Sequence, residues 1–165
     1  MSVMTTTSKP TKLTRMPRSA IPFVVIGTVS VVSGGLVSAI SASSPSYPAA
    51  WAVAYLVLVS GMGQLALGLA QAGLTVRQPR ARLVAAEAIT FNVANIAILV
   101  GALTTSMVLV DLGGGLFLIS LAVFLWGARS PRPKRKWMLY GFRVLIAILM
   151  VSTPIGLIIA SARAS

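Results

Sequence analysis

The chain contains no cysteine and no histidine, and Glu87 and Asp111 are its only side-chain carboxylates. Without cysteine it forms neither a disulfide nor a thiolate metal site, and without histidine it lacks the commonest general base and the imidazole ligand of zinc and haem. Most catalytic constellations need groups of these kinds. A paired-carboxylate mechanism would require Glu87 and Asp111 to meet. We therefore expect a protein that is not an enzyme and that holds no metal or cofactor.

Charge is also scarce, because only 10% of the residues are charged whereas 56% are hydrophobic. The mean hydropathy of +0.90 is too high for a soluble domain of this length. These values predict an all-α, polytopic integral membrane protein. The net charge of +12 does not indicate a nucleic-acid-binding protein, because no separate polar domain carries the basic residues.

Five apolar segments are each near the length of about 20 residues that crosses a hydrocarbon core. They predict five transmembrane helices at about 20–42, 49–74, 83–108, 112–128 and 138–160, with the fourth the shortest. Residues 1–18 are expected to form a flexible basic arm, 19–162 a single transmembrane domain and 163–165 a short tail. The first segment follows a basic leader, as in a signal peptide, but its apolar run exceeds the usual h-region of about 7–15 residues and indicates a retained anchor.

Most of the basic residues form three clusters, each beside the end of an apolar segment. The clusters are Lys9, Lys12, Arg15 and Arg18; Arg77, Arg80 and Arg82; and Arg129, Arg132, Lys134, Arg135 and Lys136. The other two loops, expected at Ser41–Pro48 and Asp111–Gly115, contain no Lys or Arg, and the second includes a glycine triplet typical of a tight turn. The positive-inside rule then places the N-terminus in the cytoplasm and the C-terminus outside, in a plasma membrane. The third cluster is predicted to contact anionic lipid headgroups or a partner.

Small and amide residues recur on single helix faces in the first three segments. Gly61, Gln64, Gly68 and Gln71 follow one another at alternating spacings of three and four, which places them on one face of the second segment. Gly27 and Gly34 lie in the first segment, and Asn92 and Asn95 in the third. Small residues allow close helix contact, and amides form hydrogen bonds that lipid does not offer. The pattern predicts tight packing of the first three segments.

The amides also suggest a polar layer inside the membrane. Gln64 and Asn92 are each about ten residues, or about 15 Å, from the inner ends of their helices, which is close to the bilayer midplane. Two readings of this layer are open. The amides either join helices or line a site for a headgroup or small solute.

Glu87 and Arg143 lie at a similar expected depth near the inner ends of the third and fifth segments. An unpaired charge in hydrocarbon costs several kcal/mol, so a Glu87–Arg143 ion pair is one hypothesis, and it predicts that these two segments are neighbours. Alternatively, Arg143 extends to the headgroups while Glu87 lies near a positively polarised helix N-terminus. A functional charge that takes part in proton or solute movement is the third possibility.

No sequence motif assigns an activity to the chain. The helices rich in arginine, alanine and valine, with the stretch Asn92–Asn95, resemble small bacterial membrane proteins in composition only. The small apolar body and the lack of independent chemistry favour a non-catalytic accessory or assembly subunit of a larger plasma-membrane complex, or a homo-oligomer. The alternative is a small transporter, channel or flippase component with a polar layer at the midplane. A membrane enzyme would need a partner to complete its site.

Overall fold

The computed structural model describes the backbone of residues 17–74, 80–127 and 136–164. Every regular element within these ranges is a helix, and the helices form five long segments, as predicted. The elements are η1 (Arg18–Ala20), α1 (Ile21–Ser41), α2 (Tyr47–Ala54), η2 (Tyr55–Gly63), α3 (Gln64–Leu74), α4 (Ala81–Leu103), α5 (Met107–Gly127) and α6 (Lys136–Ala164). The short 3-10 turn η1 leads directly into α1.

The second helical segment consists of α2, η2 and α3, which run on without a break. Its start is fixed locally, since the side chain of Ser46 accepts a hydrogen bond of 3.4 Å from the backbone N–H of Ala49. The middle of the segment is a nine-residue π-helix, η2. Such wide turns are rare and often occur at functional sites. The π-helix ends at Gly63, directly before Gln64, the first residue of α3.

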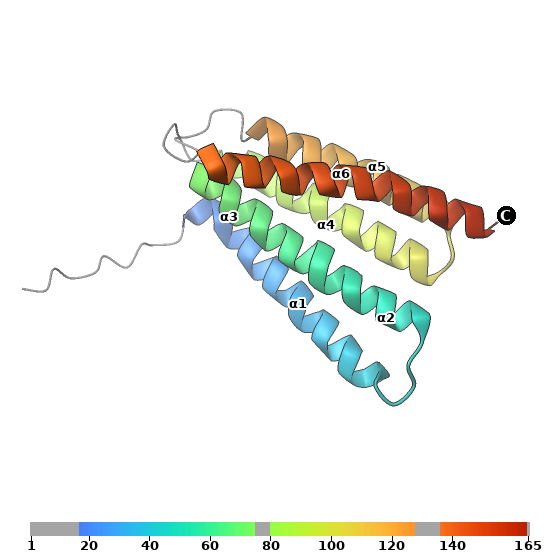
Figure 1. Ribbon diagram of the computed structural model, residues 1–165. Helices are drawn as coiled ribbons and strands as arrows, with labels where there is room; N and C mark the ends of the chain where they lie inside the picture. Colours follow the sequence, from blue (N-terminus) through green and yellow to red (C-terminus); the bar gives the residue numbers. More distant parts are fainter. Residues whose placement is uncertain (1–16, 75–79, 128–135, 165) are drawn as a thin grey trace, which may run out of the picture.

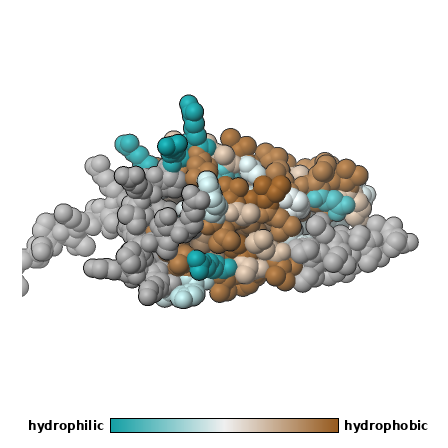
Figure 2. All heavy atoms as spheres, turned by 90° about the horizontal axis from the view of Figure 1, so that it is seen from above, coloured by the Kyte–Doolittle hydropathy of each residue, from teal (hydrophilic) through white to brown (hydrophobic). Residues whose placement is uncertain are grey.

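Four of the five segments are long and apolar enough to cross a membrane, as expected for a multi-pass membrane protein. They are Arg18–Ser41, Tyr47–Leu74, Ala81–Leu103 and Met107–Gly127. In α6, the part whose side chains are described gives a shorter apolar stretch, Leu139–Thr153. On the face drawn in Figure 2, apolar side chains cover the middle of the bundle, and hydrophilic ones gather mainly toward the end where α1 begins.

Consecutive segments run antiparallel and pack as neighbours (Figure 1). The segment α2–η2–α3 packs along α1, and α4 and α5 form the most extensive helix pair. The last helix, α6, packs on α5 and α3. The first described residues and the C-terminus lie at opposite ends of the bundle (Figure 1). The connections before α2 and before α5 lie at the C-terminal end.

Phenylalanine supplies the centre of the core. All five phenylalanines of the chain are buried, and they come from four helices: Phe23, Phe91, Phe117, Phe124 and Phe142. The ring of Phe124 lies 5.3 Å from that of Phe23 and 6.0 Å from that of Phe91, centroid to centroid. These contacts join α1, α4 and α5. Tilted and edge-on ring pairs of this kind add to the stabilisation that burial alone provides.

The predicted turn at Asp111–Gly115 is wrong. These residues lie inside α5, and the chain turns earlier, at Thr104–Ser106, where Thr105 adopts a φ of 54°. The fourth segment is therefore a full 21-residue helix. Lipid offers no partner for backbone groups, so a glycine triplet at this depth stays helical. Gly113 serves packing instead: a Cβ there would lie 2.8 Å from the backbone nitrogen of Ile98 on α4.

Candidate functional site

A carboxyl group and an amide meet inside the bundle near the end at which α1 begins, which we call the inner end. The side-chain amide of Gln71, on α3, donates a hydrogen bond of 2.9 Å to Oε1 of Glu87, on α4. Both side chains are buried, with 2% and 1% of their surface exposed. The second carboxyl oxygen, Oε2 of Glu87, is buried and has no hydrogen-bond partner. The pair therefore joins two helices and leaves one polar atom unsatisfied.

A third helix closes this site. A Cβ on Gly127, near the end of α5, would lie 2.5 Å from Nε2 of Gln71 and 3.0 Å from Oε1 of Glu87. A side chain at this position would displace the amide end of Gln71 from its place beside Glu87. We define the inner junction as Gln71, Glu87 and Gly127, which come from α3, α4 and α5.

The structure does not bring Arg143 to Glu87. Arg143 is exposed on α6, whereas the carboxyl group of Glu87 is buried and its described hydrogen bond comes from Gln71. The helices that carry the two residues are also not the principal neighbours, since α6 packs on α5 and α3. Arg143 is thus free to extend its guanidinium toward a surface, in line with the snorkelling alternative.

The asparagines of α4 have different surroundings. Asn95 is buried, and its Oδ1 accepts a hydrogen bond of 2.9 Å from the hydroxyl group of Tyr55, the first residue of the π-helix. Its amide nitrogen donates to the carbonyl of Phe91 in its own helix. Asn92 is half-buried, and its amide also donates to its own helix, at the carbonyl of Ala88. The partner of Asn95 is thus Tyr55, which is not a member of the polar layer expected from the amides.

Gln64 lies in the bundle with neither amide atom paired. The residue is completely buried, and both Nε2 and Oε1 lack a hydrogen-bond partner. The hydroxyl group of Ser120 on α5 is likewise buried and without a partner. Gln64 and Ser120 each lie seven residues, or about 10 Å along a helix, from the inner-junction residues Gln71 and Gly127. They therefore lie at one depth, further into the bundle.

The predicted small-residue face lines the contact between α1 and the second segment. A Cβ on Gly27 would lie 3.0 Å from the carbonyl oxygen of Gly61, and one on Gly34 would overlap Val57. Gly68 lies against the side chain of Phe23. Ser30 and Ser60 hydrogen-bond across the same contact at 3.1 Å. This face of α1 is therefore filled by the chain itself.

Exposed basic residues gather at the inner end of the bundle. Arg18, Arg80 and Arg82 are exposed there, at the start of η1 and of α4. The other predicted basic residues near this end lie outside the described residues: those of the arm before Arg18, then Arg77, and then Arg129, Arg132, Lys134 and Arg135. The side chain of Lys136 is not described either. Asp111 is exposed on α5 near the opposite end.

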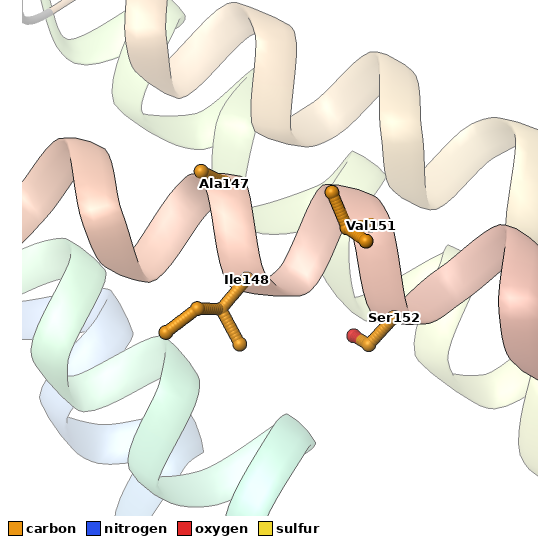
Figure 3. Close-up of a pocket in the computed structure, with 4 residues that line it drawn as sticks. All are labelled: Ala147, Ile148, Val151 and Ser152. Carbon is orange, nitrogen blue, oxygen red and sulfur yellow. The ribbon is translucent and has the colours of Figure 1, made fainter.

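The described surface includes one apolar hollow, beside the middle of α6. It is lined by Ala147, Ile148, Val151 and Ser152, which come from successive turns of this helix (Figure 3). The only hydroxyl group among them, that of Ser152, donates to the carbonyl of Leu149 in its own helix at 3.2 Å. The hollow thus suits an apolar group and offers no catalytic group.

Sequence reasoning missed two partners, those of Glu87 and of Asn95. Expected depth in the membrane already pointed to Gln71 as a partner of Glu87, since the two residues are about equally far from the basic loop between their helices. The Tyr55–Asn95 hydrogen bond has a weaker signal in the sequence, because Tyr55 lies within a largely apolar stretch. Within the described residues no three His, Cys, Asp or Glu side chains come together to hold a metal ion.

Comparison with known proteins adds no assignment. No protein-family model matches the chain, and neither the curated proteins nor the solved structures contain a match.

Proposed function

We propose that the protein is a non-catalytic accessory or assembly subunit of a larger membrane-protein complex. The observation that carries this proposal is a set of glycines on the outside of the bundle. Gly35 on α1, Gly115 on α5 and Gly141 on α6 are exposed, and an added Cβ would meet nothing within 4 Å at any of them.

Inside the bundle, glycine coincides with close helix contact. Gly27 meets the backbone of the second segment, and Gly101 and Gly113 bring α4 and α5 together. Glycine weakens a helix by about 1 kcal/mol relative to alanine, so each such position is best explained by the neighbour that it admits. By the same reasoning, the outward glycines are positions at which helices of another chain come close.

Gly115 has the clearest surroundings. Leu112, Gly115, Ile119 and Ala122 follow one another at spacings of three and four along α5, and all four are exposed. This outer α5 face, defined by these residues, combines large aliphatic side chains with small ones, as membrane helix interfaces do. A partner helix would pack its own side chains over Gly115.

The interior polar groups support a structural rather than a catalytic role. Three of the interhelical hydrogen bonds, Ser30–Ser60, Tyr55–Asn95 and Gln71–Glu87, each join two helices of the chain. They stabilise the bundle and leave its outside apolar. Our proposal places the protein in a bacterial plasma membrane, with the N-terminus in the cytoplasm and the C-terminus outside, as the basic clusters indicate.

Purification in a mild detergent, followed by mass spectrometry, tests the proposal. We expect larger membrane proteins to co-purify in stoichiometric amount, and deletion of the gene to lower their abundance. Gly115→Val should release these partners, whereas Ala86→Val, at another exposed small residue, should retain them. Recovery of the wild-type protein strictly alone would refute the proposal.

A second candidate is a small transporter, channel or flippase component. The observation that favours it is the buried, unpaired amide of Gln64 at the end of the π-helix, at the same depth as the unpaired hydroxyl of Ser120. Such groups can receive a polar solute. This function predicts solute uptake by liposomes that contain the purified protein alone, and loss of uptake in Gln64→Leu.

A further inference from the structure

The carboxyl group of Glu87 has an unbalanced set of partners. Oε1 accepts one hydrogen bond from Gln71, and Oε2 accepts none. An ionised carboxylate has room for about four hydrogen bonds and needs several of them when it is removed from water. A neutral carboxylic acid needs less, because its carbonyl oxygen accepts and its hydroxyl group carries no net charge. One donor at one oxygen therefore matches the neutral acid.

Among the described residues, no charged group supplies the missing donors to Glu87. The helices α1 and α3 contain no ionisable side chain, and on α5 the only one is Asp111, near the opposite end. On the second segment, Tyr55 donates to Asn95 and Tyr47 is exposed near the far end. The described cations nearest in the chain or in depth, Arg18, Arg82 and Arg143, are exposed. Arg77 and the Arg129–Arg135 loop lie outside the described residues.

The chemistry of the inner junction favours a proton over a metal cation. A sodium or calcium ion needs about six oxygen ligands in a shell around it. Here the amide of Gln71 presents its nitrogen to the carboxyl group, and Gly127 contributes no side chain. The other side-chain carboxylate of the chain, Asp111, lies near the opposite end of the bundle, close to the start of α5. A proton on Oε2 needs none of these ligands.

We propose that Glu87 is a proton-binding site, with the proton on Oε2 and the carbonyl oxygen Oε1 hydrogen-bonded to Gln71. The same geometry explains Gly127, which lets α5 cover the neutral acid and exclude water from it. Release of the proton would leave a buried carboxylate with a single donor, so it requires the inner junction to admit water or a cation. This inference is independent of whether the protein is a subunit or a transporter.

Infrared spectroscopy of the full-length protein in lipid vesicles tests the proposal directly. At neutral pH we expect a carboxylic-acid carbonyl band that is absent in Glu87→Gln and retained in Asp111→Asn. The band should give way to carboxylate bands only when the pH is raised. If the Glu87-dependent signal at neutral pH is that of a carboxylate, the proposal is wrong. Loss of the acid band on addition of sodium chloride at constant pH would also overturn it, by showing a cation site.

Gln71→Leu provides the second variant, which identifies the band even if Glu87→Gln does not fold. Removing the amide donor frees the carbonyl oxygen Oε1, so the acid band should move to higher frequency and remain at neutral pH. A purely structural role of Gln71 would not move the band. An unchanged frequency would show that the acid does not accept this hydrogen bond, and would contradict the assignment.

Discussion

The hydroxyl group of Tyr55 donates a hydrogen bond of 2.9 Å to Oδ1 of Asn95, which connects the first residue of the π-helix to the middle of α4. The ring of Tyr55 also stacks on that of Trp51, with 5.1 Å between their centroids. The hydrogen bond joins the helix pair of α1 and the second segment to the pair of α4 and α5. It thus connects the same parts of the bundle as the inner junction does, but at another level, 16 residues before Gln71 along the second segment.

Replacing Tyr55 by phenylalanine keeps the ring and removes the hydroxyl group. We expect the free energy of unfolding to fall by about 0.6–2 kcal/mol, the range measured for hydrogen bonds between membrane helices. Unfolding in bicelles measures this change. Tyr140→Phe, at an exposed ring on α6, is the matched control and should have no effect. Equal stability of the Tyr55 variant and the wild type would mean that the link contributes nothing.

Gly68 and Gly35 should respond in opposite ways to alanine. Gly68 lies against Phe23, so a methyl group there must displace a buried ring, and we expect a loss of about 1–3 kcal/mol. Gly35 has open space around it, so Gly35→Ala should stabilise the isolated protein by up to about 1 kcal/mol, through helix propensity. Thermal unfolding of the purified protein in detergent distinguishes the two. Similar effects at both positions would contradict the described packing of α1.

Thr105 is the described non-glycine residue with a positive φ, in the turn between α4 and α5. A β-branched residue is strained in this conformation, so Thr105→Gly should stabilise the protein by about 1 kcal/mol. Thr104→Gly is the control, because Thr104 has a φ of −97° and gains nothing from glycine. A thermal shift assay compares the two variants. A lower melting temperature for Thr105→Gly would argue against the turn.

Glu87 and Arg143 should behave as independent residues in a double-mutant cycle. Arg143 is exposed and Glu87 is hydrogen-bonded to Gln71, so the coupling free energy between Glu87→Gln and Arg143→Gln should be close to zero. The cycle Glu87→Leu with Gln71→Leu, in which each variant removes one partner of the hydrogen bond, should instead show coupling of about 0.5–3 kcal/mol. Strong coupling to Arg143 would restore the ion pair that the sequence first suggested.

Hydropathy and the basic clusters predicted the five helices because they report on length and composition, which the bilayer constrains strongly. The same reasoning misplaced one turn. Glycine signals a turn in water, whereas Gly113 sits inside α5 because lipid enforces the helix and α4 needs a close approach there. Residues near that turn, such as Asp111, were consequently assigned to a loop.

Depth was easier to predict than direction around the helix axis. Glu87 was correctly recognised as a residue inside a helix near its inner end, but depth alone offered Arg143 and Gln71 equally as partners. To choose between these two partners, one must know how α3, α4 and α6 are rotated about their own axes. This rotation depends on packing around Phe91 and Phe124 and not on local sequence. The π-helix adds to this difficulty, because it changes the rotation of the second segment between Tyr55 and Gln64.

Photocrosslinking from the outer α5 face in native membranes tests the central claim most directly. With p-benzoylphenylalanine in place of Leu112, beside Gly115, we predict a crosslinked product of discrete mass that contains a different membrane protein. The same substitution at Ile89, an exposed residue of α4 away from the outward glycines, should give lipid adducts only. Lipid adducts alone at both positions would contradict the proposal that this protein is a subunit of a larger complex.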